Sequence, residues 1–352
     1  MMPEEWPIAA PAADRNAPAR AGGRDRLSTV RVDFFLDPAE RLTEQERALM
    51  TAMLRCLVGD IADEIRGLLP NLPMAANDQG NLALIDALLS AGLLDRAGLV
   101  RLLLRRADEE RIATGAKARI GRREARVVQG LVSHGDGAVA AAAMALIIAR
   151  GRRRDRFGQC LLHFDDLQQE DAAALANAIA AGLRRELAII VGKAEADRLL
   201  SAAAGQLLAS HDAGSSIENL TATLVRLLDE EGDLADELIL AAAIEGEMNF
   251  VAHSLAKRSG LSGDVALQEL LSGDSNRVMA LLRISLLKRE SAAGLLAGIG
   301  DLLGVPDPAR AIARFDAMTE TEAGDVLNWL CADSRYQQAV ANLARADGQR
   351  SL

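Results

Sequence analysis

The chain has few aromatic residues, few prolines and almost no cysteine. Tryptophan, tyrosine and phenylalanine together make up 3% of its 352 residues, although half of all residues are hydrophobic. Sheets favour aromatic and β-branched side chains, whereas alanine and leucine favour close-packed helices. The composition therefore predicts an all-α protein that is long enough to bury a sizeable core.

The three cysteines, Cys56, Cys160 and Cys331, are odd in number and far apart in the sequence. This spacing offers neither a disulfide framework nor a Cys-x-x-Cys metal site. We expect all three to be small buried side chains. The sequence predicts no metal, no cofactor and no catalytic residue.

No apolar run reaches the roughly 18 uncharged residues that a membrane-spanning helix needs. Glu4 and Glu5 stand where a signal peptide would carry positive charge. These two features predict a cytoplasmic protein that does not enter a membrane.

Negative charge prevails, but it is unevenly distributed. The net charge is -10, yet the basic segment 96–156 holds fifteen Arg or Lys against six Asp or Glu. Arginine pairs bidentately with carboxylate or phosphate, so this segment requires an anionic neighbour. That neighbour is the acidic C-terminal half of the same chain, another protein, or a nucleic acid. The candidate partner-binding residues are Arg119, Arg122, Arg123, Arg126, Arg150, Arg152, Arg153, Arg154 and Arg156.

Residues 1–27 hold four prolines and no hydrophobic periodicity, which predicts a disordered tail. The alternation from Val30 to Phe34 indicates either a strand or an extended arm docked on helices. Thr43 and Glu46 form a capping box that opens a helix running toward Leu69. Further helical runs are predicted over 81–91, 95–113, 117–134, 169–190 and 194–211.

A glycine followed by an acidic residue recurs between apolar helical runs, as at the joint of a helical hairpin. Glycine ends one helix in the left-handed conformation, and the next carboxylate accepts the first amides of the following helix. The predicted hinges are Gly59-Asp60, Gly135-Asp136, Gly246-Glu247 and Gly273-Asp274. The first pair either splits the helix after Thr43 or is tolerated inside it. Repeated hairpins predict a stacked, HEAT-like helical array.

A break of small residues at Gly214 predicts a boundary between an N-terminal helical region, 28–213, and an acidic hairpin region, 214–352. Residues 206–352 hold 22 Asp or Glu against 12 Arg or Lys. Self-association of this region with the basic segment of a second copy is therefore a further prediction.

Three stretches resemble the bacterial family called domain of unknown function 2336. They are the run from Phe34 through Met50, the hinge Val132–Asp136, and the run from Phe250 to Leu261. The similarity spans roughly residues 30–305. It implies cytoplasmic helical proteins with repeats similar to the HEAT type, and it implies no catalytic residues.

Histidines suggest chemistry at two places in the chain. His211-Asp212, with His163 and either Asp229 or Asp233, is similar to the ligand set of helical metal-dependent phosphohydrolases. His253, followed by Lys257, is similar to the exposed histidine of a helical phosphotransfer module, although Arg258 stands where such modules carry glycine. A capping role at a helix end and a half-buried position on a repeat helix are the structural alternatives.

We interpret the chain as a non-enzymatic helical-repeat scaffold, in bacterial signalling or regulation, that binds an acidic protein partner through its arginines. A nucleic-acid-binding repeat protein is the first alternative. A helical phosphotransfer or phosphohydrolase-like signalling protein is the second.

Overall fold

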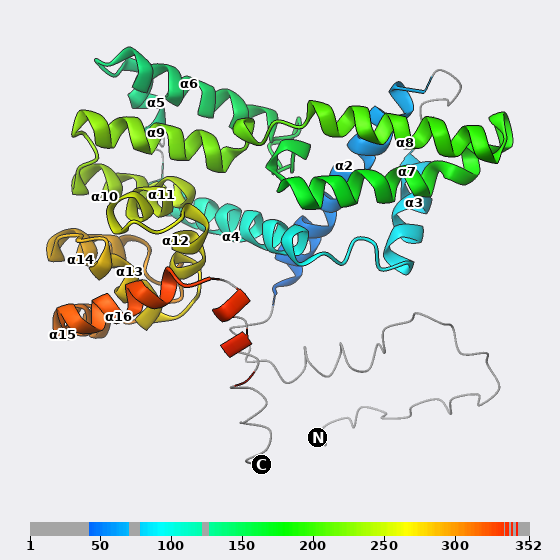
Figure 1. Ribbon diagram of the computed structural model, residues 1–352. Coiled ribbons are helices and arrows are strands. Elements are labelled where there is room, and N and C mark those ends of the chain that lie inside the picture. Colours follow the sequence, from blue (N-terminus) through cyan, green and yellow to red (C-terminus); the bar gives the residue numbers. More distant parts are fainter. Residues whose placement is uncertain are drawn as a thin grey trace, which may run out of the picture.

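The computed structural model describes residues 42–69, 78–121, 127–333, 335–337, 339–340 and 343. The predicted tail 1–27 and the alternating segment 30–34 lie outside these ranges. Within these ranges the protein is an all-α array of stacked helices and has no β-strand (Figure 1). The fold class is confirmed.

The longest helices of the described chain are α2, α4, α7 and α8, and shorter helices that follow one another as hairpins make up most of the rest. Their bounds are α2 (Glu44–Gly67), α3 (Asp78–Ser90), α4 (Ala97–Ile120), α5 (Val127–Gly130), α6 (Gly137–Arg152), α7 (Gln169–Val191), α8 (Lys193–Ser210), α9 (Ile217–Glu231), α10 (Asp236–Ile244), α11 (Met248–Ser259), α12 (Gly263–Leu270), α13 (Ser275–Ile284), α14 (Arg289–Ile299), α15 (Pro308–Ala317) and α16 (Glu320–Leu330). Short 3-10 turns η2 (Leu131–Ser133), η3 (Phe164–Asp166) and η4 (Ala213–Ser215) join some of them.

Helix α2 begins with the predicted capping box. The Glu46 amide donates to Thr43 Oγ1 at 3.2 Å, and the Thr43 amide donates to Glu46 Oε2 at 2.7 Å. The helix then runs unbroken through Gly59 and Asp60, so the hinge predicted there is absent. Gly59 is buried, and a Cβ on it would stand 3.4 Å from the Asn81 side chain of α3. That distance is an ordinary van der Waals contact, so the packing of α3 does not by itself require a glycine at this position.

The apolar side chains form two cores. The first lobe is built from α2, α3, the first half of α4, α7 and α8. The second lobe is built from α5, α6 and α9–α16, and it includes Ile112 of α4. Because α5 and α6 belong to the second lobe, the chain passes from the first lobe to the second, returns over residues 153–168, and crosses again after α8 (Figure 1). The boundary at Gly214 stays a prediction, and it coincides with the last of these crossings.

Helix α4 belongs to both lobes, since it runs from the first core across the hairpin turns of the second. The interruption expected between residues 113 and 117 is absent. Gly246, with a φ of +79°, ends α10 so close to α4 that a Cβ would lie 2.8 Å from the Cα of Ala113. Farther along α4, Leu302 lies against Gly115. These close contacts make α4 a spine for the second lobe.

The other predicted hinges lie between helices. Asp136 accepts the amides of Ala138 and Val139 at the start of α6, and Asp274 accepts the amide of Asn276 at the start of α13. Glu247 precedes α11 without capping it, because its carboxylate pairs with Arg150 instead.

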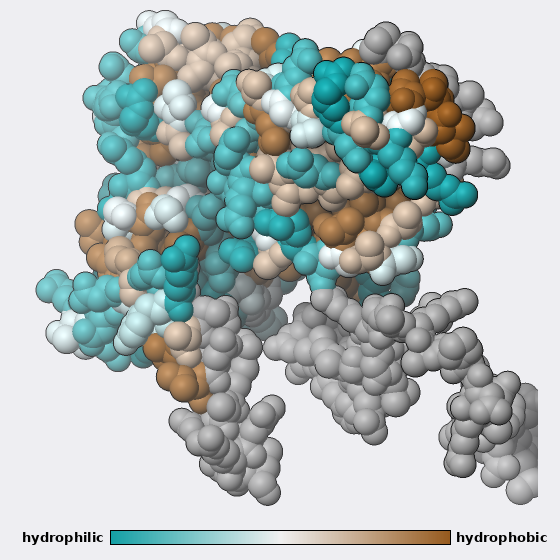
Figure 2. All heavy atoms as spheres, turned by 45° about the vertical axis from the view of Figure 1, so that its right-hand side comes forward, coloured by the Kyte–Doolittle hydropathy of each residue, from teal (hydrophilic) through white to brown (hydrophobic). Residues whose placement is uncertain are grey.

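The surface is mixed in polarity. Figure 2 brings the first lobe forward and shows apolar side chains gathered in patches between polar ones. No helix of the described residues is long and apolar enough to cross a membrane. Cys56 and Cys331 are exposed and Cys160 is half-buried, so the expectation that all three are buried is wrong.

Candidate functional site

Most of the predicted partner-binding arginines that the structure describes are held by acidic groups of the same chain. Arg150 pairs with Glu247 at 2.7 Å, and Arg154 pairs with Glu110 at 2.7 Å. Arg119 pairs with Asp301, and Arg153 pairs with Asp166. Arg122, Arg123 and Arg126 lie outside the described residues. The remaining two, Arg152 and Arg156, are exposed and make no ion pair with the described residues.

Arg153 and Asp166 form the centre of a buried ion-pair network between the lobes, which we call the joint. The Asp166 side chain is inaccessible to solvent, and its two oxygens accept from Arg153 Nε at 2.9 and 2.8 Å. Arg153 also donates to the carbonyls of Ala149 and Ser215. Burial raises the pKa of Asp166, but Arg106 and the bonds from Arg153 outweigh burial and hold that pKa below its usual value.

Arg106 of α4 extends the joint. Its guanidinium lies 2.9 Å from Glu218 of α9 and 2.8 Å from Glu109. Arg106 is almost fully buried, and the neighbouring carboxylates overcome the opposing effect of burial and raise its pKa well above the usual value. Sequence reasoning missed Arg106 because it stands outside the two dense arginine clusters. Its partner Glu218 is 112 residues away, so no local pattern marks the pair.

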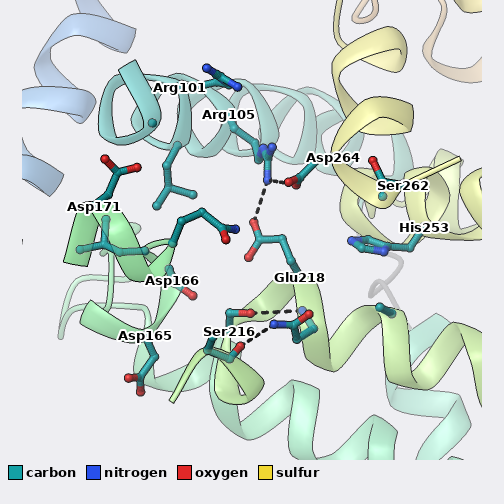
Figure 3. Close-up of a pocket in the computed structure, with 18 residues that line it drawn as sticks. Arg101, Arg105, Asp165, Asp166, Asp171, Ser216, Glu218, His253, Ser262 and Asp264 are labelled. Atoms are coloured by element: carbon teal, nitrogen blue, oxygen red, sulfur yellow. Dashed lines mark hydrogen bonds and ion pairs between the residues drawn. The ribbon is translucent and has the colours of Figure 1, made fainter. Parts of the chain in front are cut away.

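A polar cavity of about 340 Å³ opens beside the joint, between α4, α7, α9, α11 and α12. Figure 3 shows Arg105 between two carboxylates, 3.3 Å from Glu218 and 2.8 Å from Asp264, with the His253 imidazole directed toward the cavity. Arg101 points away from these carboxylates. The arginines and carboxylates facing one another balance much of the local charge.

His253 is packed rather than presented to solvent. Its Nε2 is buried and has no hydrogen-bond partner, and a Cβ on Gly263 would lie 2.1 Å from its Cε1. Burial lowers the pKa of His253, and Arg105 acts in the same direction against Glu218 and Asp264. A phosphotransfer histidine must offer a ring nitrogen to a donor protein, and Nε2 does not meet that requirement here.

The residues proposed for a phosphohydrolase site do not converge. His211 Nε2 lies 3.1 Å from the Leu167 carbonyl, and its ring packs edge-on against Phe164. Asp229 pairs with Lys257, and Asp233 pairs with His134. In the described part of the chain, no group of three or more His, Cys, Asp or Glu is placed to hold a metal ion.

Residues 154–160 form an ordered turn that carries an exposed aromatic side chain beside the second arginine cluster. The Asp155 carboxylate accepts the amides of Phe157 and Gln159, both at 2.8 Å. Arg154 donates to the Gly158 carbonyl, and a short bridge joins Arg154 to Cys160. Phe157 is 74% exposed, with the Arg156 guanidinium 4.7 Å from its ring centroid. We call this feature the Arg156–Phe157 turn.

On the side that faces the rest of the protein, side chains of the turn and of its neighbours line a small cavity. Arg150, Arg153 and Arg154 line a cavity of about 190 Å³ together with Glu247 and Cys160. Burial raises the pKa of the Cys160 thiol to about 11, so the thiolate that oxidation and metal binding need is scarce at neutral pH.

A family model described as an uncharacterised protein conserved in bacteria, DUF2336, matches residues 116–328. The chain belongs to this family. The match extends beyond residue 305, where the resemblance in the sequence was expected to end, and it does not include the run from Phe34 to Met50. No curated protein and no solved structure matches the chain.

Proposed function

We propose that this DUF2336 protein is a non-catalytic interaction scaffold of the bacterial cytoplasm, and that a protein partner docks on the Arg156–Phe157 turn. The observation that carries the proposal is the exposed Phe157 on a turn that the protein has ordered with its own hydrogen bonds. An aromatic ring in water has no structural benefit for the monomer, whereas aromatic and arginine side chains dominate binding energy at interfaces.

The turn is suited to binding because little order has to be created on association. Immobilising loops and side chains reduces affinity, and a loop already held in place avoids much of that cost. Asp155 fixes the backbone, and the pairing of Arg154 with Glu110 anchors the turn to α4. The backbone that carries Phe157, with Arg156 beside its ring, is therefore held in place before a partner binds.

The charge of the turn favours an acidic partner. Arg152, at the end of α6, and Arg156 have no carboxylate among the described residues, while their neighbours in sequence are neutralised. Among the candidate arginines that the structure describes, only these two lack a carboxylate, which is a small footprint for nucleic acid, whose binding proteins line a groove or face with many cations. They suffice to orient a protein interface through complementary charge.

The polar groups with possible chemistry have structural roles, which supports a non-catalytic function. Asp166 and Glu218 are paired with arginines, and His211 is bonded to a backbone carbonyl. The hairpin stack supplies a rigid frame of the kind that repeat proteins use for binding.

The test compares three tagged forms of the full chain in affinity purification from native cells with nuclease present: wild type, Phe157→Ala, and the double variant Arg152→Glu/Arg156→Glu. We expect a nuclease-resistant partner to be recovered with wild type and reduced at least tenfold with both variants. Arg198→Glu, an exposed charge reversal on α8, is the matched control and should retain the partner. Equal recovery from all four forms would refute this docking site.

Two further measurements separate the alternative ligands. Loss of captured material from wild type on nuclease treatment would favour nucleic acid. Light scattering of the purified protein at tens of micromolar tests a second copy as the acidic partner, because a dimer that Arg152→Glu/Arg156→Glu converts to monomer would identify self-association.

A further inference from the structure

A shallow apolar groove lies between α4 and the α12–α13 hairpin. It encloses about 170 Å³ and is lined by Leu104, Leu267 and Leu271, with Arg101, Asp108 and Arg277 at its edges. Drug-sized ligands take about 300–1,000 Å³, so this groove has room for one or two side chains. An extended peptide segment suits it better than a metabolite.

The groove continues into an exposed apolar stripe on α4. Val100 is 41% exposed and Leu104 is 37% exposed, and they are four residues apart on one helix face. Apolar side chains at this spacing normally face a core. Here Leu104 lines the groove opposite Leu267 and Leu271, and neither Val100 nor Leu104 is buried in a core, so the stripe has the character of an uncovered contact surface.

The start of α2 lies at one end of this groove. Arg111 of α4 is 3.1 Å from Glu46 and 3.1 Å from Asp108. The chain that precedes Leu42 therefore joins the described structure next to Asp108. That chain contains Val30, Val32 and the run Phe34-Phe35-Leu36.

We propose that residues 30–36 of this same chain occupy the groove and the α4 stripe, with Phe34 or Phe35 against Leu104. Eight residues separate Phe34 from Leu42, and an extended chain spans about 3.3 Å per residue, so the reach is about 26 Å. Leu104 is seven residues from Arg111 on α4, which is about 10 Å at 1.5 Å per residue. The tether is long enough without strain.

Charge agrees with this occupant. Arg101 makes no ion pair with the described residues and points away from the carboxylates of the neighbouring cavity (Figure 3). Asp33 and Asp37 bracket the aromatic pair, and either carboxylate would supply the partner that Arg101 lacks. Arg277 is already paired with Glu269 and Arg105 with Asp264, so of the described arginines that line the groove only Arg101 has no carboxylate.

The tether also favours this segment over a second copy or another protein. A segment linked by a short chain has an effective concentration in the millimolar range, which a free partner rarely reaches. One or two aromatic side chains bind the groove only weakly, but the tether allows a segment of the same chain to occupy it.

The test places a photoreactive benzoylphenylalanine at position 34 or 35 of the full chain. After irradiation of purified protein at micromolar concentration, we expect a monomer-sized product whose cross-linked peptides come from residues 100–108 or 267–277. Leu104→Glu should reduce the yield at least fivefold. Leu82→Glu, at a site 40% exposed on α3, is the matched control and should leave the yield unchanged.

Hydrogen exchange provides a readout that does not depend on the cross-linker. Amides 30–36 should exchange at least tenfold more slowly in wild type than in Leu104→Glu, with equal rates in Leu82→Glu. Cross-links confined to dimer-sized products, cross-links to other regions, no cross-link, or rapid exchange of these amides in wild type would each overturn the proposal.

Discussion

The joint and the Arg156–Phe157 turn draw on the same stretch of arginines and use them in opposite ways. Arg153 is buried, with Asp166 on one side and backbone carbonyls on the other. Arg156, three residues later, lies over an exposed ring and makes no ion pair with the described residues. The difference shows that charge density in a sequence does not by itself identify a binding surface. Each arginine must be assigned after its neighbours in space are known.

The largest effect should follow from breaking the joint. Asp166→Ala leaves Arg153 and Arg106 buried without their shared carboxylate, which for a buried pair costs about 3–5 kcal/mol. We expect a corresponding fall in the free energy of unfolding, measured by urea denaturation. Asp197→Ala removes the exposed partner of Arg184 and is the control, which should have a far smaller effect. Similar losses in both variants would show that the joint is not the more important contact.

A second test addresses α4 as the spine of the second lobe. Gly246→Ala forces a Cβ into a left-handed position 2.8 Å from the backbone of Ala113, so we expect about 2–4 kcal/mol of destabilisation. Gly232→Ala has a similar φ, +81°, but no atom within 4 Å of the added Cβ. It should therefore show only the backbone penalty, about 1–2 kcal/mol. If thermal or urea unfolding showed that the two variants lose equal amounts of stability, close packing of α4 on the turn at Gly246 would be contradicted.

The cavity beside the joint should make stability depend on pH through His253. Burial lowers the pKa of His253 in the folded protein, below the value of about 6.5 expected when unfolded. Between these two values the unfolded chain binds more protons, so the free energy of unfolding falls as the pH falls. The contribution is at most about 1.4 kcal/mol per pH unit. Urea denaturation at pH 7.5 and 5.5 should show a smaller fall in the free energy of unfolding for His253→Gln than for wild type. Identical falls in the two proteins would refute the role of His253.

The smallest effect on stability is expected at the turn. Arg152→Glu/Arg156→Glu changes two exposed side chains that make no ion pair with the described residues. The free energy of unfolding should therefore change by no more than about 0.5 kcal/mol. The same variant should lose the partner. A loss of stability comparable to that of Asp166→Ala would mean that these arginines have a structural role as well.

Much of the architecture could be predicted from local patterns. The capping box at Thr43 and the amphipathic runs over 169–190 and 194–211 identify helices, because each depends on residues only a few positions apart. Gly59 shows the limit of this reasoning. A glycine at a helix joint and a glycine inside a continuous helix look the same in sequence, and only the structure shows that α2 continues through Gly59.

The candidate site was harder to predict, since its contacts join distant parts of the chain. The basic segment required an anionic neighbour, and the acidic C-terminal half of the same chain was one of three possibilities. Asp301 and Glu247 now pair with Arg119 and Arg150, so the chain itself supplies much of that neighbour. The order of the turn that carries Phe157 was not visible in the sequence either.

The sequence by itself determined that this protein is helical, because helix propensity, capping and hydrophobic periodicity act between near neighbours. It also determined that its arginines needed anions. Only the tertiary structure decided which arginines were neutralised within the chain and which stayed exposed. Ion pairing and burial depend on distances between residues that are tens to nearly two hundred positions apart, and folding alone sets those distances.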